Sequence, residues 1–150
     1  MANTYTCLFY HIVFSTKNRD AWIAQEYEER IWNYLGGIAK ENDALTIRIG
    51  GVSDHVHLVV RTPPTIAPSE LVKAIKGGSS RWIHETFPKL SAFAWQDGFG
   101  AFTVSKSKVP EVVEYIAGQR DHHRTRTFQE EYRALLQKHE TEFDERYVWG

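Results

Sequence analysis

The chain of 150 residues is 42% hydrophobic and 13% aromatic, which suffices for one ordinary hydrophobic core, so we expect a single domain over residues 1–150. Its 18 basic residues nearly balance its 19 acidic ones, and the net charge of -1 argues against a protein that binds nucleic acid through its overall charge. The one cysteine, Cys7, excludes an intrachain disulfide and a thiolate zinc site and indicates a reducing cytoplasm, and the lack of any run of ~20 apolar residues predicts a soluble protein without membrane contact.

The first half of the chain contains three predicted strands and one predicted helix. Residues 4–15 are rich in Tyr, Phe, Ile and Val and predict a strand that ends in a polar loop. Apolar residues recur at helical spacing over residues 22–42, which predicts a helix. Residues 44–50 alternate between apolar and polar and predict a second strand, and the apolar stretch 55–62 is too short for a helix and predicts a third.

The second half contains three predicted helices and one further strand. Ser69 is a good N-cap for a helix that ends near Phe87, and residues 99–105 predict a fourth strand. Pro110 suits the first turn of a helix that runs to about His122, and Thr127 begins the last helix.

The order of these elements is strand, helix, strand, strand, helix, strand, followed by two helices. This order is typical of the ferredoxin-like (RRM-like) fold, in which helices pack on an antiparallel sheet. We therefore predict an α+β protein of this kind, whose added C-terminal helices carry Tyr115.

Two histidines, His55 and His57, stand two residues apart on the third predicted strand. Side chains two apart on a strand point to the same face, so both imidazoles can reach one metal ion, while Val56 and Leu58 point to the other face. Two histidines on a half-exposed strand face without any ligand role are the alternative interpretation.

A tyrosine and a glutamine lie one turn apart on the helix after Pro110. Tyr115, Gln119 and His122 follow one another at offsets of four and three residues, on a face that adjoins an apolar stripe. The alternative is a tyrosine that packs at the edge of the core and a glutamine in solvent.

Basic residues flank these candidate site residues and predict contacts with DNA phosphates. Trp82 and Trp95 are candidates for stacking on bases. Solvated cations on helix faces are the alternative interpretation. The predicted DNA-binding residues are Lys17, Arg19, Lys73, Lys76, Arg81, Lys106 and Arg120.

Taken together, these segments resemble the IS200-like transposases, which are single-tyrosine HUH endonucleases and include the REP-associated tyrosine transposases. The resemblance covers nearly the whole chain. It rests on the segments YHIVFSTKNR, GGVSDHVHLVV, LVKAIKGGSSRWI, GFGAFTVSKS, YIAGQRDHH and FDERYVW.

The resemblance implies roles for four residues. Tyr115 would be the nucleophile that attacks DNA, and His55, His57 and Gln119 would be the metal ligands. Two imidazoles and an amide oxygen leave open positions for phosphate and water, which suits Mg²⁺ or Mn²⁺. His122 and His11 are candidates for accepting the proton of the tyrosine.

The resemblance also implies an activity and partners. The protein would cleave and rejoin single-stranded DNA through a 5′-phosphotyrosine link, without a nucleotide cofactor, and would recognise hairpin or palindromic DNA. It would act as a homodimer, with a site formed within one subunit or between two.

Three alternative functions stay open from the sequence. A REP-associated enzyme would process repeats of the host genome with the same residues. A catalytically inactive relative would bind nucleic acid only, since the same fold serves RNA-binding domains. A metal-dependent hydrolase would use water as the nucleophile and would not need Tyr115.

Overall fold

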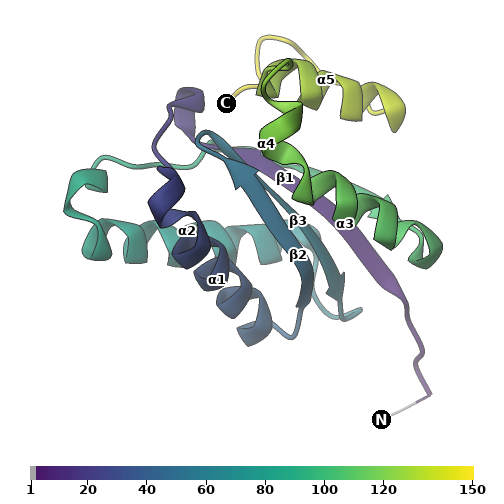
Figure 1. The fold of residues 1–150 in the computed structure, drawn as a ribbon. Helices are drawn as coiled ribbons and strands as arrows, with labels where there is room; N and C mark the ends of the chain where they lie inside the picture. The colour runs from purple at the N-terminus through teal and green to yellow at the C-terminus, as the bar shows by residue number, and fades with distance from the viewer. Residues whose placement is uncertain (1–2) are drawn as a thin grey trace.

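The computed structural model describes residues 3–150, which form a four-stranded antiparallel sheet in the order β2-β3-β1-β4 with helices on both faces (Figure 1). This architecture confirms the predicted α+β, ferredoxin-like arrangement. The strands are β1 (Leu8–Ser15), β2 (Leu45–Val52), β3 (His55–Thr62) and β4 (Gly100–Val104). The helices are α1 (Gln25–Glu41), α2 (Pro68–Thr86), α3 (Val109–Ala117), α4 (Gln119–His122) and α5 (Phe128–Lys138), with short 3₁₀ turns η1 (Lys17–Arg19), η2 (Pro88–Leu90) and η3 (Lys106–Lys108).

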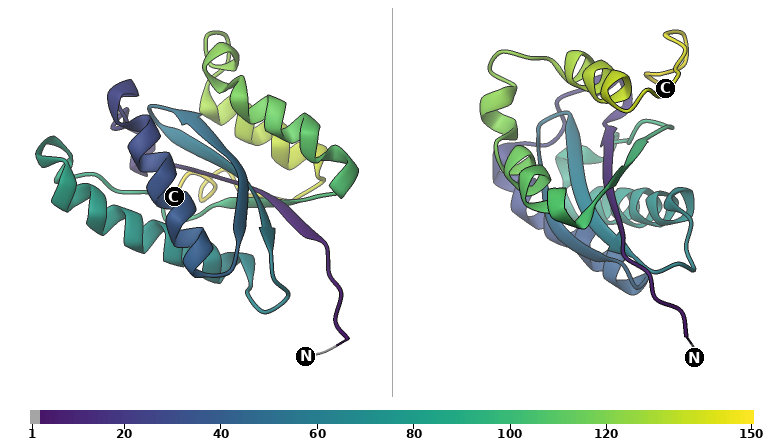
Figure 2. Two further views of the ribbon diagram at one scale, coloured as in Figure 1. Left: turned by 60° about the horizontal axis from the view of Figure 1, so that its bottom comes forward. Right: turned by 90° about the vertical axis from the view of Figure 1, so that its right-hand side faces the viewer.

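Helices α1 and α2 cover one face of the sheet and enclose the larger hydrophobic core (Figure 2). Alternate residues of the two inner strands supply the sheet side of this core, among them Phe14 on β1 and Val56 and Leu58 on β3. Because side chains alternate along a strand, His55 and His57 point to the opposite face, as the sequence predicted.

Helices α3, α4 and α5 cover that opposite face. A smaller hydrophobic cluster lies there, in which Phe128 and Tyr132 of α5 pack on Val13 and Phe102 of the sheet. A β-carbon on Gly100 would lie 2.7 Å from the Tyr132 ring, so a glycine at this position lets α5 approach the sheet closely.

The predicted cap of α2 was wrong. Ala67 is the N-cap residue and Pro68 occupies the first turn, so Ser69 lies inside the helix. Proline is favoured in a first turn because its missing N–H has no intrahelical partner there. Thr127, where the sequence predicted the last helix to begin, is the N-cap residue of α5 and forms a reciprocal capping box with Glu130.

The helix predicted from Pro110 to about His122 is divided in two. It is interrupted at Gly118, which has φ -90° and ψ 12°, so α3 carries Tyr115 whereas α4 carries Gln119. The other boundaries differ at their starts: β1 begins at Leu8 and α1 begins at Gln25, each later than the sequence indicated.

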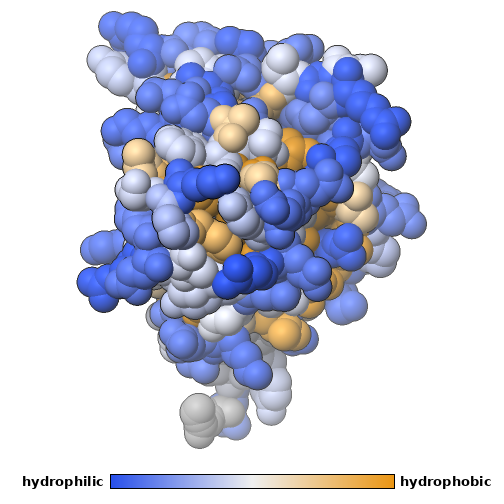
Figure 3. All heavy atoms as spheres, turned by 60° about the vertical axis from the view of Figure 1, so that its left-hand side comes forward, coloured by the Kyte–Doolittle hydropathy of each residue, from blue (hydrophilic) through white to orange (hydrophobic). Residues whose placement is uncertain are grey.

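Strand β2 lies at an edge of the sheet and leaves two apolar side chains exposed. A register shift between Thr46 and Arg48 interrupts its pairing with β3, and Leu45 and Ile47 are exposed. The face of the molecule in Figure 3 is mostly hydrophilic, with hydrophobic residues visible between the hydrophilic ones. Within residues 3–150, no helix combines the length and the apolar character that crossing a membrane requires.

Candidate active site

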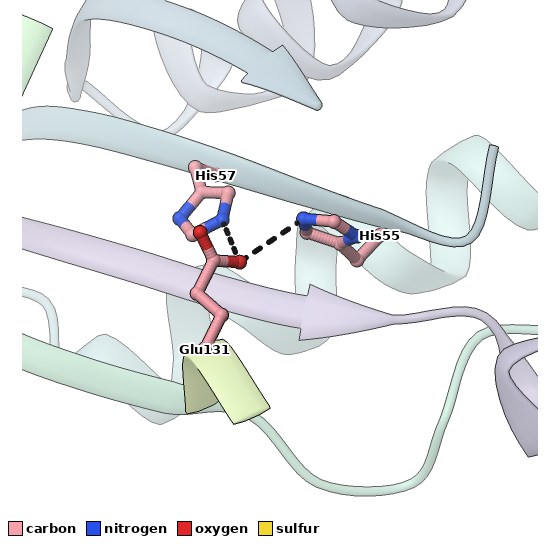
Figure 4. A group of neighbouring side chains, drawn as sticks. All are labelled: His55, His57 and Glu131. Carbon is pink, nitrogen blue, oxygen red and sulfur yellow. Dashed lines mark hydrogen bonds and ion pairs between the residues drawn. The ribbon is translucent and has the colours of Figure 1, made fainter. Parts of the chain in front are cut away.

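The histidine pair lies on an inner strand beneath α5 and is inaccessible to solvent. His55 and His57 are both 0% exposed and lie at the start of β3, which pairs with β1 (Figure 4). A β-carbon on Gly50, the β2 partner of His57, would lie 2.9 Å from the side chain of Ile116, so this glycine lets α3 lie close to the histidines.

A carboxylate that the sequence analysis did not single out lies between the two histidines. Glu131 is buried near the start of α5, and its Oε1 atom lies 3.2 Å from His55 Nε2 and 3.0 Å from His57 Nε2 (Figure 4). The ligand atoms of these three residues all lie within 4.8 Å of one another, which suits a bound metal ion. Glu131 lies on the last predicted helix with no motif around it, and only its buried position reveals it.

The structure brings the predicted tyrosine and glutamine to the same carboxylate. The Tyr115 hydroxyl donates a hydrogen bond to Glu131 Oε2, and Gln119 Nε2 donates to the same atom at 3.0 Å. The Gln119 side-chain oxygen lies 2.9 Å from His55 Nε2. The four residues predicted for the site therefore lie together around Glu131.

Further histidines surround this group. His123 Nε2 lies 3.1 Å from Glu131 Oε1, and His11 Nε2 lies 2.8 Å from His57 Nδ1. His122, which was predicted as a possible proton acceptor with His11, packs its ring 4.9 Å from the Tyr115 ring.

The electrostatics of the cluster favour a positive charge at its centre. Burial opposes the cationic form of His55, but hydrogen bonds to Asp54 and Glu131 outweigh this and raise its pKa to about 9. Burial would also raise the pKa of Glu131, but hydrogen bonds from His123, His55 and His57 hold that pKa well below its usual range. A carboxylate that stays ionised among imidazoles is a suitable ligand for a cation.

The acidity of the tyrosine is low in this arrangement. Burial and the adjacent charge of Glu131 raise the pKa of Tyr115 above its ordinary value, so the phenol keeps its proton. Burial and the neighbouring His57 lower the pKa of His11 to about 3, so His11 is neutral. Nucleophilic attack by Tyr115 therefore requires a nearby proton acceptor.

Tyr115 and Glu131 open on a hollow of about 700 Å³ between α3, α5 and the end of β4. Lys108, Arg126 and Lys138 line the same hollow. Three cations beside a tyrosine suit a phosphate backbone, because phosphate contacts in nucleic-acid complexes come mainly from lysine and arginine.

A second hollow, of about 740 Å³, lies on the other side of His123. Four arginines line it: Arg19, Arg120, Arg124 and Arg126. Two of these, Arg19 and Arg120, were predicted DNA-binding residues, although Arg120 also pairs with Glu28. Arg126 lines both hollows, so the two lie next to each other at the site.

The other predicted DNA-binding residues line neither of these hollows. Lys73 and Arg81 are exposed on α2, which covers the face of the sheet opposite the histidines. Lys17 and Lys106 are exposed in the turns η1 and η3. The Lys76 ammonium donates to the backbone carbonyls of Gln96, at 2.7 Å, and Gly98.

The two tryptophans proposed to stack on bases belong to the hydrophobic core or its edge. Trp95 is 6% exposed and donates a hydrogen bond to Ser79, so base stacking on it is excluded. Trp82 is partly exposed, and its ring stacks on that of Tyr34.

Comparison with known proteins identifies the family. A sequence model of the family described as "Transposase IS200 like" matches residues 4–119, which include His55, His57, Tyr115 and Gln119. The chain belongs to the IS200-like transposases.

Two characterised relatives and two solved structures agree with this family. The chain is 29% identical to the ISDra2 transposase TnpA of Deinococcus radiodurans over 76% of this chain and 85% of the relative. It is 26% identical to the transposase of insertion sequence IS200 of Salmonella typhimurium, over 73% of this chain and 75% of that relative.

The structural comparisons support the fold. A candidate transposase of Deinococcus radiodurans R1 superposes with a TM-score of 0.66 at 27% identity, over 79% of this chain and 95% of the other. A REP-associated tyrosine transposase bound to a REP hairpin superposes with a TM-score of 0.61 at 13% identity, over 82% of this chain and 73% of the other.

Proposed function

We propose that this IS200-like transposase cleaves and rejoins single-stranded DNA with Tyr115 as the nucleophile. The observation that carries the proposal is the contact between Tyr115 and Glu131, since Glu131 also touches His55 and His57. The tyrosine thus lies beside a cation site and opens on a hollow lined by basic residues.

The residues present fit a divalent metal ion, Mg²⁺ or Mn²⁺. His55, His57 and Glu131 would hold it, and the side-chain oxygen of Gln119 lies within reach of the same position. Such an ion, when bound, neutralises the charge of the scissile phosphate and orients it.

The chain's own groups provide the remaining chemistry. The Tyr115 oxygen attacks the phosphorus and forms a phosphotyrosine bond, while the bond from phosphorus to the 3′-oxygen breaks and releases a 3′-OH. Glu131 Oε2 accepts the hydrogen bond of the phenol and orients it, and the phenolic proton passes to water in the hollow beside Tyr115. Attack of another 3′-OH on the phosphotyrosine reverses these bond changes and rejoins the DNA, so no nucleotide cofactor is needed.

The DNA partner is proposed from the charge of the site and from the family. Lys108, Arg126 and Lys138 would contact the phosphates of a single strand that enters the hollow beside Tyr115. A REP-associated relative is bound to a hairpin, which supports hairpin or palindromic DNA as the substrate. A role in processing host repeats would use the same residues and differ only in the palindrome recognised.

The homodimer that the family resemblance implies also belongs to this proposal. Light scattering of the purified protein should give twice the mass of one chain. A mass equal to one chain at working concentration would remove this part of the proposal and leave the chemistry of the site unchanged.

The proposed mechanism predicts a covalent link between Tyr115 and the cleaved DNA. Labelled single-stranded DNA that carries the palindromes flanking the gene should give a protein–DNA adduct on a denaturing gel when a divalent ion is present. Tyr115→Phe should abolish the adduct, because phenylalanine lacks the attacking oxygen. Tyr5→Phe is the matched control, since Tyr5 is 89% exposed and lies outside the site.

Two outcomes would contradict the proposal. Cleavage that persists in Tyr115→Phe without an adduct would indicate a hydrolase that uses water. Tight binding of a cognate hairpin without any cleavage by the unaltered protein would indicate a nucleic-acid-binding relative.

A further inference from the structure

We propose that His123 completes the metal site of His55, His57 and Glu131, and that the resulting set of three imidazoles and one carboxylate selects a transition-metal ion such as Mn²⁺ over Mg²⁺. This inference rests on the metal dependence in the proposed function and specifies its ligands and its ion. His123 was not among the predicted ligands.

Three imidazole nitrogens converge on one point. The Nε2 atoms of His55, His57 and His123 lie 3.2, 3.0 and 3.1 Å from the single atom Glu131 Oε1. His55 and His57 share a face of β3 through their spacing, whereas His123 comes from the segment after α4, so local sequence spacing does not bring it to the pair. Four donor atoms, all buried or nearly buried, therefore lie close enough together to bind one cation.

The other ring nitrogen of each histidine, Nδ1, also has a hydrogen-bond partner. His55 Nδ1 donates to Asp54 Oδ1 at 2.7 Å, and His57 Nδ1 lies 2.8 Å from His11 Nε2. His123 Nδ1 donates to the backbone carbonyl of Arg126 at 2.8 Å. A bound metal ion would displace the proton that each Nε2 shares with Glu131, and a partner at Nδ1 would then hold the remaining ring hydrogen, which is the usual outer arrangement of metal-binding histidines.

His123 therefore has the same arrangement as the two histidines on β3. Its ring also packs against that of His55, with centroids 4.4 Å apart, and its side chain is 10% exposed. A solvated histidine at the end of a helix would be expected to have neither a fixed ring nor an Nε2 atom directed at a buried carboxylate.

The types of ligand atom at the site determine which metal ion it favours. Mg²⁺ prefers oxygen ligands in octahedral geometry and keeps several of its waters, whereas imidazole nitrogens suit transition-metal ions. Three imidazoles and a carboxylate replace most of those waters. Glu131 Oε1 faces the histidines, and Oε2 remains for Tyr115 and Gln119, so the carboxylate can serve the ion and the tyrosine together.

His123 and Glu131 lie outside the part of the chain that the family model matches, which ends at Gln119. They are supplied by the turn after α4 and by α5, which reach the histidines through the packing of Phe128 and Tyr132 on the sheet.

The test measures metal binding directly, without DNA. The full chain is stripped with a chelator and titrated with MnCl₂, and free Mn²⁺ is followed by electron paramagnetic resonance. The unaltered protein should bind one Mn²⁺ per chain, and a tenfold excess of MgCl₂ should not displace it. His123→Ala and Glu131→Gln should each weaken Mn²⁺ binding about 100-fold or more, beyond the 10- to 100-fold loss usual for outer-shell changes.

His139→Ala is the matched control. His139 is exposed at the end of α5, and its ring nitrogen bonds to the Leu135 carbonyl rather than facing the histidine cluster, so its loss should leave Mn²⁺ affinity unchanged. Circular dichroism and a thermal melt of each variant show that it is folded. His123→Gln, which keeps a polar side chain at this position, provides a second test if the alanine variant unfolds.

Two results would overturn the inference. Mn²⁺ affinity that is the same in both His123 variants as in the unaltered chain would remove His123 from the site, and equal affinity for Mg²⁺ and Mn²⁺ would refute the selection. Either result leaves the covalent adduct of Tyr115 intact, so failure of the inference is distinguishable from failure of the proposed function.

Discussion

Single residues show how the same side-chain type can serve different purposes in this chain. Lys73, Lys76 and Arg81 all lie on α2 and were grouped as DNA-binding residues because of their charge. The structure gives Lys76 a distinct position, because its ammonium bonds to carbonyls of residues 96–98 and lies 5.1 Å from the Phe14 ring centre. Charge alone does not separate a structural lysine from a solvated one.

We expect Lys76→Met to destabilise the protein by about 1.5 kcal/mol, because hydrogen bonds from a charged group to partly buried carbonyls are lost. Lys73→Met should change stability by less than about 0.5 kcal/mol, since Lys73 is exposed. Urea denaturation of the two variants measures the difference. Equal stabilities would show that the contacts of Lys76 contribute little to folding, and DNA binding by both variants can be compared in the same preparations.

At the scale of elements, the helix caps decide where the site residues begin. Thr127 starts α5 four residues before Glu131, so the cap fixes the turn that carries the carboxylate. Ser69 has the residue type of a cap but lies one residue beyond Pro68, inside the first turn of α2.

Thr127→Ala should therefore cost about 1 kcal/mol of stability, because the backbone N–H of Glu130 loses its side-chain acceptor. Ser69→Ala should cost less than about 0.5 kcal/mol, since Ser69 does not cap the helix. Thermal or urea unfolding compares the pair, and a larger loss in Ser69→Ala than in Thr127→Ala would contradict these cap assignments.

The close contact between β2 and α3 gives a second prediction at this scale. A β-carbon on Gly50 would lie 2.9 Å from the Ile116 side chain and 3.0 Å from its carbonyl oxygen, next to Tyr115. Gly50→Ala should destabilise the protein by about 1–3 kcal/mol and reduce adduct formation, because α3 has to move away from the sheet.

Gly37→Ala is the control for this substitution. A β-carbon there meets nothing within 4 Å, so alanine in α1 should stabilise the protein by about 0.5–1 kcal/mol. Denaturant unfolding and the adduct gel measure both effects. Full stability together with full activity in Gly50→Ala would show that α3 does not need this close approach.

At the scale of the whole molecule, the arrangement of the site predicts that one chain can supply all of its parts. Tyr115, Gln119 and Glu131 contact the histidines of their own chain. A mixture of Tyr115→Phe with His57→Ala should therefore form no adduct, because neither chain retains a complete site. Recovery of the adduct on mixing would mean that the tyrosine of one subunit acts with the histidines of the other.

Much of the fold was predictable because it depends on local patterns. Alternation along β3 placed His55 and His57 on one face, and apolar periodicity located the helices. The starts of β1 and α1 were less predictable, because nothing in the side-chain pattern marks where backbone pairing or a helix begins. The break at Gly118 was also missed, since a single glycine is compatible with a continuous helix.

The sequence by itself determined the order of the elements, the shared face of the histidine pair and, through the family resemblance, the placing of Tyr115 and Gln119 beside it. Only the tertiary structure revealed Glu131, His123 and Asp54 around that pair. Asp54 and His123 lie within segments that carry the resemblance, but nothing in those segments indicates their contacts at the site, and Glu131 lies on a helix without a motif. They meet because α5 packs on the second face of the sheet, and that contact depends on long-range burial and on glycines at close approaches.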